Sequence, residues 1–192
     1  MQAVMLHSGE AVQRYSIPYY NYRTASPSFD LGFPPDINQG YGQLRLSNVL
    51  PLPTGHGLPY PLKLFVWDAV NVTERSVWKW EVDIGPSLSM SYLLQPLKVT
   101  VAWYDPPAAF ASAAVLLLHD IDLVVVTPTG DIWWGNAMLS GDYLNPNEQI
   151  YIPHAKCYRN NCKFSIYVKA HTFPERTWQT LAVVVTAAGK SL

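Results

Sequence analysis

Charged residues are scarce in this sequence. Asp, Glu, Lys and Arg make up 14% of its 192 residues, against about 25% in an average soluble domain. The net charge is −1 and the basic residues are scattered, so the basic stripe that neutralises the phosphates of a nucleic acid is missing. We therefore expect no nucleic-acid partner. The low charge also indicates a surface that another protein surface covers.

Long apolar runs are missing as well. No window reaches the about 20 apolar residues that a membrane-spanning helix needs, and the apolar run at 113–118 ends at His119 and Asp120. The first residues, MQAVMLHSGEAV, have no positively charged start and too short an apolar segment for a secretory signal peptide. We expect no membrane span, and any secretion signal would be encoded outside this sequence.

Cysteine is nearly absent, and the two that occur, Cys157 and Cys162, lie between two strand-like runs. A hairpin there could bring their Cα atoms within disulfide range. Two free thiols are the alternative, although exposed thiols react in an oxidising compartment. A zinc site would need two further ligands, of which only His154 is near. The arrangement favours a disulfide, which points to an extracellular or secretory-pathway location.

What is present changes along the chain. Residues 2–14 have apolar residues near helical spacing with a break at Gly9, which predicts one short helix. Residues 15–38 are rich in Tyr and Pro without a period, which predicts an irregular loop, and 51–61 is a predicted proline-rich linker. Beyond it, short apolar runs predict strands at 62–67, 77–84, 97–103, 121–127, 132–134, 149–152, 164–170 and 181–186. Eight strands without a convincing helix favour a mainly β fold, an eight-stranded jelly-roll β-sandwich over residues 62–192.

Tryptophan positions predict which strand faces are buried. The run VWKWEVDI at 77–84 alternates, and we expect its tryptophan-bearing face to be the inner one. Trp133 and Trp134 are adjacent, so they must point to opposite faces of a strand. One of them should lie in the core. The other would contact another domain rather than form a platform for sugars.

Asp120 and Asp122 are the most distinctive polar feature. Residues two apart in a strand point to the same side and hold their carboxylates within about 7 Å, so something must offset their repulsion. Ca²⁺ takes about 6 to 8 oxygen ligands, and the following segment is rich in oxygen donors. We predict a calcium site formed by Asp120, Asp122, Asn136, Asn147 and Glu148, with Asp131, Asp142 and Asn145 as further donors. The alternative is that the two aspartates accept hydrogen bonds from loop amides or pair with a nearby Lys or Arg.

No catalytic arrangement is evident in the sequence. A serine hydrolase needs a serine, a histidine within hydrogen-bond reach and an acid that orients the histidine. Ser8 follows His7 directly, and neighbouring residues on a helix point about 100° apart, so His7 is badly placed as a base for Ser8. The remaining histidines occur singly. We therefore predict no catalytic residues in this chain.

One glycosylation sequence occurs, Asn71-Val72-Thr73. Such triplets arise often by chance, so Asn71 is a predicted glycosylation site only if the protein is secreted. The expected disulfide supports that condition.

Several segments resemble the C-terminal end of a subtilisin-like serine protease of the type that carries a jelly-roll β-sandwich after its catalytic domain. QAVMLHSGEAV is similar to the helix after the nucleophile helix, and NQGYGQLRLSNVL to the last turn and strand of the protease domain. PLKVTVAWYDPPA and HDIDLVVVTPTGDIWWGN resemble the family's Trp-x-Asp-x-Pro and Asp-Leu-Asp-Leu strands, and NPNEQIYIP with WQTLAVVVT resembles its closing strands. The stretch 15–35 has no counterpart and looks like an insertion.

The resemblance implies that residues 1–50 are the remnant of an α/β catalytic domain and that the sandwich stabilises this domain, upstream in the same polypeptide or in trans. The family's Asp-Thr-Gly or Asp-Ser-Gly, His-Gly-Thr and Gly-Thr-Ser-Met-Ala signatures are absent, so the chain alone should not cleave peptides. The family usually has Asn-Asp where this chain has His119 and Asp120, a departure that counts against calcium. The alternative function is a free-standing β-sandwich module that binds carbohydrates or protein surfaces.

Overall fold

The computed structural model describes residues 1–12, 14–16, 28–30, 34–36, 38–50, 62–85, 96–107, 117–158 and 161–188. The predicted linker at 51–61 lies outside these residues, as does most of the Tyr-rich stretch. Within the described residues the fold is mainly β, and the strand pairs are antiparallel.

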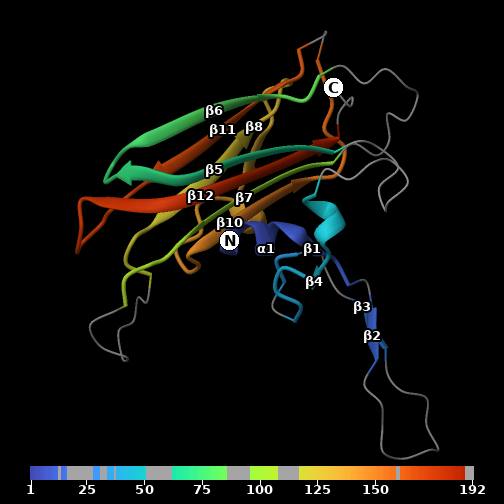
Figure 1. The fold of residues 1–192 in the computed structure, drawn as a ribbon, viewed down its shortest axis with the longest axis horizontal. Helices are drawn as coiled ribbons and strands as arrows, with labels where there is room; N and C mark the ends of the chain where they lie inside the picture. Colours follow the sequence, from blue (N-terminus) through green and yellow to red (C-terminus); the bar gives the residue numbers. More distant parts are fainter. Residues whose placement is uncertain are drawn as a thin grey trace, which may run out of the picture.

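Two four-stranded antiparallel sheets form the body of the protein (Figure 1). Sheet I has the strand order β10-β7-β12-β5, and sheet II has the order β6-β11-β8-β9. The strands are β5 (Leu62–Thr73), β6 (Val77–Asp83), β7 (Leu97–Trp103), β8 (Ile121–Val126), β9 (Ile132–Trp134), β10 (Asn147–Ile152), β11 (Lys163–Ala170) and β12 (Trp178–Ala188). Each matches one predicted run. β5 and β12 are longer than predicted because their shared ladder continues through polar residues such as Asn71 and Thr180.

The apolar core lies between the two sheets, consistent with a β-sandwich. Val99 and Val101 of sheet I and Leu123 and Ile166 of sheet II are fully buried in one cluster. Along β11, buried residues alternate with more exposed ones, as the two-residue period of a strand requires. Burial of a side chain of this size contributes about 1.5–3 kcal/mol, so this layer is the main source of stability.

The N-terminal segment lies against the outer face of sheet I. The helix α1 (Gln2–Ser8) ends before Gly9, as predicted, because Gly9 has an extended backbone and begins a strand. Only glycine fits there, since a Cβ would lie 1.9 Å from the carbonyl oxygen of Tyr41. Ala3 of α1 packs with Ala102 of β7 and Val184 of β12. β7 is therefore covered on both faces, which explains why nearly all of its residues are buried, including Thr100 on the outer face.

The segment that joins α1 to the sandwich contains further short elements. β1 (Gly9–Glu10) pairs with β4 (Gln43–Leu44), and the 3₁₀ helix η1 (Leu46–Asn48) follows. β2 (Arg14–Ser16) pairs with β3 (Ser28–Asp30) within the stretch predicted to be an irregular loop. Strands of three residues are too short to produce an alternation that the sequence could reveal.

Two expectations about tryptophan need correction. On β6, Val82 is buried as predicted, but Trp78 on the same face is 42% exposed because β6 is an edge strand of sheet II. On β9, Trp133 is 39% exposed and Trp134 is only half-buried. The prediction that one of them lies in the core was wrong, since β9 is the other edge strand of sheet II.

Candidate functional site

A buried carboxyl group, that of Glu148, lies at one end of the sandwich. β9 pairs with residues 124–126 of β8 only, and the Leu123 N–H donates instead to Oε2 of Glu148 at 2.6 Å. Burial, together with the nearby charges of Asp122 and Asp142, raises the pKa of Glu148 from 4.5 to about 9, although the hydrogen bond from Leu123 opposes the rise. Without a bound cation, this environment favours the protonated form of Glu148, which has no charge to repel the two aspartates.

Asp120 and Asp122 meet around one histidine, His171. Nε2 of His171 lies 2.6 Å from Oδ2 of Asp122, whose side chain is almost fully buried. The backbone N–H of His171 donates to the backbone oxygen of Asp120 at 2.9 Å. Burial raises the pKa of the Asp120 carboxyl, and His171 opposes the rise. The side chain of Asp122 is thus paired with a histidine, not with the loop amide, Lys or Arg of the alternative prediction, and Oδ1 of Asp120 has no hydrogen-bond partner.

The predicted asparagines form a hydrogen-bonded network beside these acids. Nδ2 of Asn136 donates to Asp142 at 2.6 Å, and Oδ1 of Asn136 accepts from the Gln149 N–H at 3.0 Å. The Tyr41 hydroxyl donates to Oδ1 of Asn147, and burial raises the pKa of Tyr41. Both amide oxygens thus already accept protein hydrogens.

Two glycines allow the loop 135–141 to close over the acids. A Cβ on Gly135 would lie 1.9 Å from Oε2 of Glu148, and a Cβ on Gly141 would lie 1.9 Å from Oδ1 of Asp122. Any side chain at these positions would displace the carboxylates. Sequence reasoning missed both glycines, because nothing in their local sequence shows which side chain approaches them.

The predicted calcium ligands fit a cation only in part. Oδ1 of Asp120 and Oε1 of Glu148 are buried without a hydrogen-bond partner, which is the environment that a cation would satisfy. Asn136 and Asn147 are engaged as described above, and Asp131 lies in a separate turn where it accepts from Thr129. Among the described residues, no group of three or more His, Cys, Asp or Glu side chains is arranged as a metal site. Calcium stays a prediction that rests on the carboxylates.

His7 and Ser8 do not contact each other as base and nucleophile. Oγ of Ser8 donates to the Met5 carbonyl oxygen at 2.7 Å. The His7 ring lies instead between the hydroxyls of Thr100 and Thr186, at 2.9 and 2.7 Å. The structure thus supplies a physical reason against catalysis by this pair.

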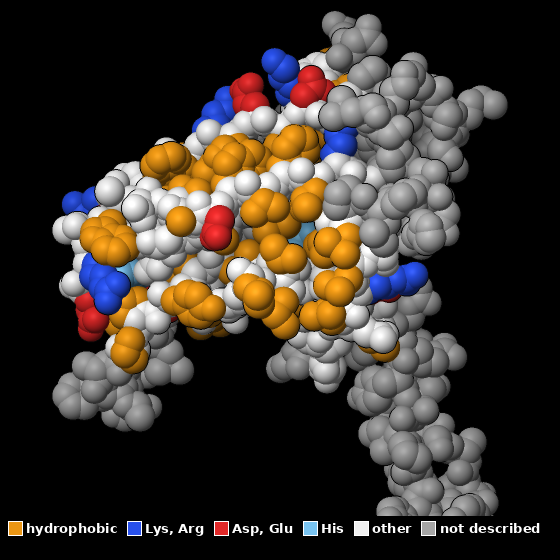
Figure 2. Space-filling model, viewed as in Figure 1, with side chains coloured by type: hydrophobic (Ala, Val, Ile, Leu, Met, Phe, Trp, Pro, Cys, Tyr) orange, Lys and Arg blue, Asp and Glu red, His pale blue; other side chains and the backbone are white. Residues whose placement is uncertain are grey.

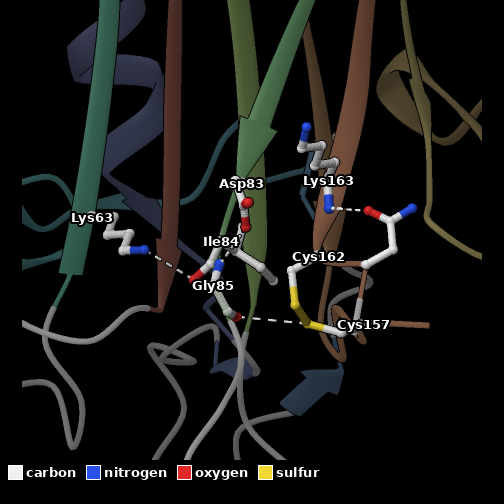
Figure 3. The surroundings of a disulfide bond; sticks show 8 residues. Lys63, Asp83, Ile84, Gly85, Cys157, Cys162 and Lys163 are labelled. Carbon is white, nitrogen blue, oxygen red and sulfur yellow. Dashed lines mark hydrogen bonds between the residues drawn. A yellow bond between two sulfur atoms is a disulfide. The ribbon is translucent and has the colours of Figure 1, made fainter. Parts of the chain in front are cut away.

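A disulfide joins Cys157 and Cys162 in the turn between β10 and β11 (Figure 3). Their Cα atoms are 4.3 Å apart, and Sγ of Cys157 lies 3.6 Å from the Gly85 carbonyl oxygen. Beside it, Nζ of Lys63 in β5 donates to the backbone oxygen of Ile84 at 3.1 Å. The disulfide therefore closes the end of the sandwich where these contacts connect sheets I and II.

Asn71 lies exposed on β5. Its Oδ1 accepts a hydrogen bond from the Thr180 hydroxyl at 2.7 Å, and this contact leaves the side-chain nitrogen to carry a glycan. The position is compatible with the predicted modification.

Comparison with known proteins leaves the family open. The chain matches no protein-family model, and no curated protein sequence matches it. In the described part of the chain, no helix has the length and apolar character that crossing a membrane requires. The resemblance to subtilisin-like proteases therefore stays a prediction.

Proposed function

We propose that this chain is the C-terminal part of a subtilisin-like serine endopeptidase, in which the β-sandwich stabilises the catalytic domain. The observation that carries the proposal is the packing of the N-terminal segment on sheet I. Ala3, His7 and Ser8 are buried there, so this segment is attached firmly to the sandwich. The resemblance assigns the same segment to the end of a catalytic domain.

The exposed side of the N-terminal segment supports this proposal. Met1 is 92% exposed and Met5 51% exposed, and Leu44, Leu46 and Leu50 are exposed as well. Exposed apolar side chains on α1 and on the β4–η1 stretch that contacts it favour a surface that further protein covers. In Figure 2, hydrophobic side chains spread over the face in view while charged ones lie mainly along its margins.

Activity measurements test the proposal directly. The purified chain should not cleave a peptide substrate, because it carries no catalytic triad. Cleavage that a serine-directed inhibitor abolishes would overturn this. The genomic sequence upstream of the Met1 codon provides the second test, since an open frame encoding Gly-Thr-Ser-Met-Ala is expected there or in a gene whose product binds this chain. Absence of both would remove the protease proposal.

The proposal includes a jelly-roll topology for the sandwich. From β5 to β12 the strands belong in turn to sheets I, II, I, II, II, I, II and I, an order that is mirrored about the β8–β9 pair. A long hairpin wrapped around a barrel produces such an order, and a jelly roll consists of two Greek keys arranged in this way. An experimental structure with a different strand order would overturn this part.

Calcium binding is a further part of the proposal, with Asp120, Asp122 and Glu148 as the carboxylate donors. A ligand that binds only the folded state raises its stability, so the thermal unfolding midpoint should be higher with calcium than with a chelator. The double variant Asp120→Ala/Asp122→Ala should lose this difference, whereas Asp131→Ala, in its separate turn, should keep it. Equal midpoints for the unmodified protein in calcium and in chelator would exclude the site.

We extend the proposal to the secretory pathway, on the disulfide and on the exposed Asn71. When the protein is secreted from eukaryotic cells, an N-glycosidase should lower its mass. The Asn71→Gln variant should show no such change. An unmodified Asn71 in secreted protein would contradict the glycosylation prediction.

A binding module is the second candidate function, favoured by a row of aromatic rings between the edge strands β5 and β6. Phe65, Trp67, Trp80 and Trp78 follow one another with neighbouring ring centroids 6.2, 5.6 and 6.1 Å apart. The exposed end of the row, Trp78, could stack on the apolar face of a sugar ring. Saturable binding on a glycan array that Trp78→Ala abolishes would favour this function. If no glycan binds, carbohydrates are excluded as the ligand of such a module.

A further inference from the structure

Two basic side chains, His7 of α1 and Lys98 of β7, lie where the N-terminal segment (residues 1–12) packs on the outer face of sheet I. We propose that the docking of this segment is a pH-controlled device, in which residues 1–12 dock firmly at alkaline pH and are released from sheet I as the pH falls. The inference does not depend on the protease proposal, since it rests on contacts within this chain.

His7 is satisfied in its neutral form. Its ring is fully buried, with Nδ1 2.9 Å from the Thr100 hydroxyl and Nε2 2.7 Å from the Thr186 hydroxyl. Nε2 of Gln149 donates to the Thr100 hydroxyl at 2.9 Å, which leaves the Thr100 hydrogen free to be donated to Nδ1. Nε2–H of His7 can then donate to Thr186. A second ring proton, on Nδ1, would reverse the hydrogen bond with Thr100, leave the Thr100 hydroxyl hydrogen without its acceptor and place a charge on a buried ring.

Lys98 lies beside His7 on the same face of sheet I. Its Nζ donates to the carbonyl oxygen of Gly9, directly after α1, at 2.7 Å. Burial lowers the pKa of Lys98 to about 8, and Glu10 opposes this. Burial lowers the pKa of His7 well below 6.5, and the charge of Lys98 lowers it further. The two bases thus oppose each other's protonation.

The surroundings offer little negative charge to either base. Glu10 is the acid whose charge acts on Lys98, and its carboxylate is already paired with Arg45 at 2.6 Å. Tyr151 of β10 lies opposite Lys98 in the sheet. The described side chains of β12, residues 178–187, include no titratable group. Within the described residues, therefore, only Glu10 compensates a proton gained beneath α1.

Both bases destabilise docking in acid. The released His7 binds a proton near pH 6.5, whereas the docked ring resists it, so its contribution to docking is complete above pH 6.5 and is lost as the pH falls further. The released Lys98 is protonated below about pH 10.5 and the docked one below about 8, so its contribution is lost between these values. The expected release therefore proceeds in two stages.

Hydrogen exchange of the full chain tests the device. Between pH 9 and pH 5, protection of the amides in residues 4–10 should fall at least tenfold relative to β8, after correction for intrinsic exchange rates. His7→Gln keeps a donor and an acceptor for the two threonines and should lose the stage below pH 6.5. His154→Gln, at an exposed histidine, is the matched control and should behave like the unmodified protein. Constant protection in the unmodified protein, or unchanged release in His7→Gln, would overturn the proposal.

A second measurement decides the case if His7→Gln fails to dock at any pH. In an NMR titration of the unmodified protein, the His7 ring should gain its second proton below pH 6.5, together with the loss of protection in α1. Protonation of His7 with α1 still protected would overturn the proposal.

Discussion

The two faces of sheet I are buried by different chemistry. On the inner face, Val99 and Val101 pack against sheet II without a polar partner. On the outer face, Thr100 and Thr186 bind His7 beneath α1 through hydrogen bonds. Apolar burial is insensitive to pH, whereas hydrogen bonds to a titratable ring depend on its protonation. The inner face therefore stabilises the fold, and the outer face controls an attachment.

The largest expected effect comes from the inner face. Trp103→Ala should lower the free energy of unfolding by about 3–5 kcal/mol, because it removes a buried aromatic side chain and leaves a cavity. Val66→Ala, on the outer face at 48% exposure, is the control and should change stability by no more than about 0.5 kcal/mol. Denaturant unfolding measures both. Similar losses would contradict the assignment of the two faces.

Glu148 is the exception on the inner face, and its replacement should be the next largest effect. Because its folded pKa is about 9 against 4.5, its neutral form imposes no titration penalty below pH 4.5. Stability is then lost progressively as the pH rises from 4.5 to about 9. In the presence of a chelator, so that no cation offsets the charge, Glu148→Gln should remove this dependence and stabilise the protein at pH 8 by about 2–4 kcal/mol. Glu81→Gln, at an exposed acid, is the control. Denaturant unfolding from pH 5 to 9 measures the pH dependence of stability. The prediction is contradicted if Glu148→Gln shows the same pH dependence as Glu81→Gln and the unmodified protein.

The smallest expected effect lies on the outer face. Thr186→Val keeps the shape of the side chain but leaves Nε2 of His7 without its partner, which should cost about 1–2 kcal/mol. Thr180→Val on the same strand removes only the contact with exposed Asn71 and should cost less. Denaturant unfolding compares the two. A greater loss in Thr180→Val would show that His7 is not held as described.

Periodicity predicted the strands well and their environments less well. The strict alternation of β11 needs only local sequence, so its run was predicted within one residue of its bounds. Trp133 and Trp134 were misjudged because the sequence does not show that β9 lies at a sheet edge. Gly135 and Gly141 were missed because their contacts come from other strands.

The acidic cluster was predicted in composition but not in bonding. As the oxygen-rich sequence suggested, most of the predicted ligands lie close together. The charges of Asp122 and Asp142 act on Glu148, and Asn136 donates hydrogen bonds to Asp142 and to the backbone oxygen of Asn147. The sequence could not show that Tyr41 would occupy an asparagine oxygen, since Tyr41 is 106 residues from Asn147. Nor could it show that His171 would be the partner of Asp122.

The sequence by itself determined a mainly β chain with little charge and the pairing of Cys157 with Cys162. These properties follow from composition, two-residue periodicity and short separations along the chain. Only the tertiary structure decided which polar groups are buried together. His7 meets Thr100 and Thr186 across 93 and 179 residues, and partners so distant are selected by sheet pairing and packing, which local sequence does not encode.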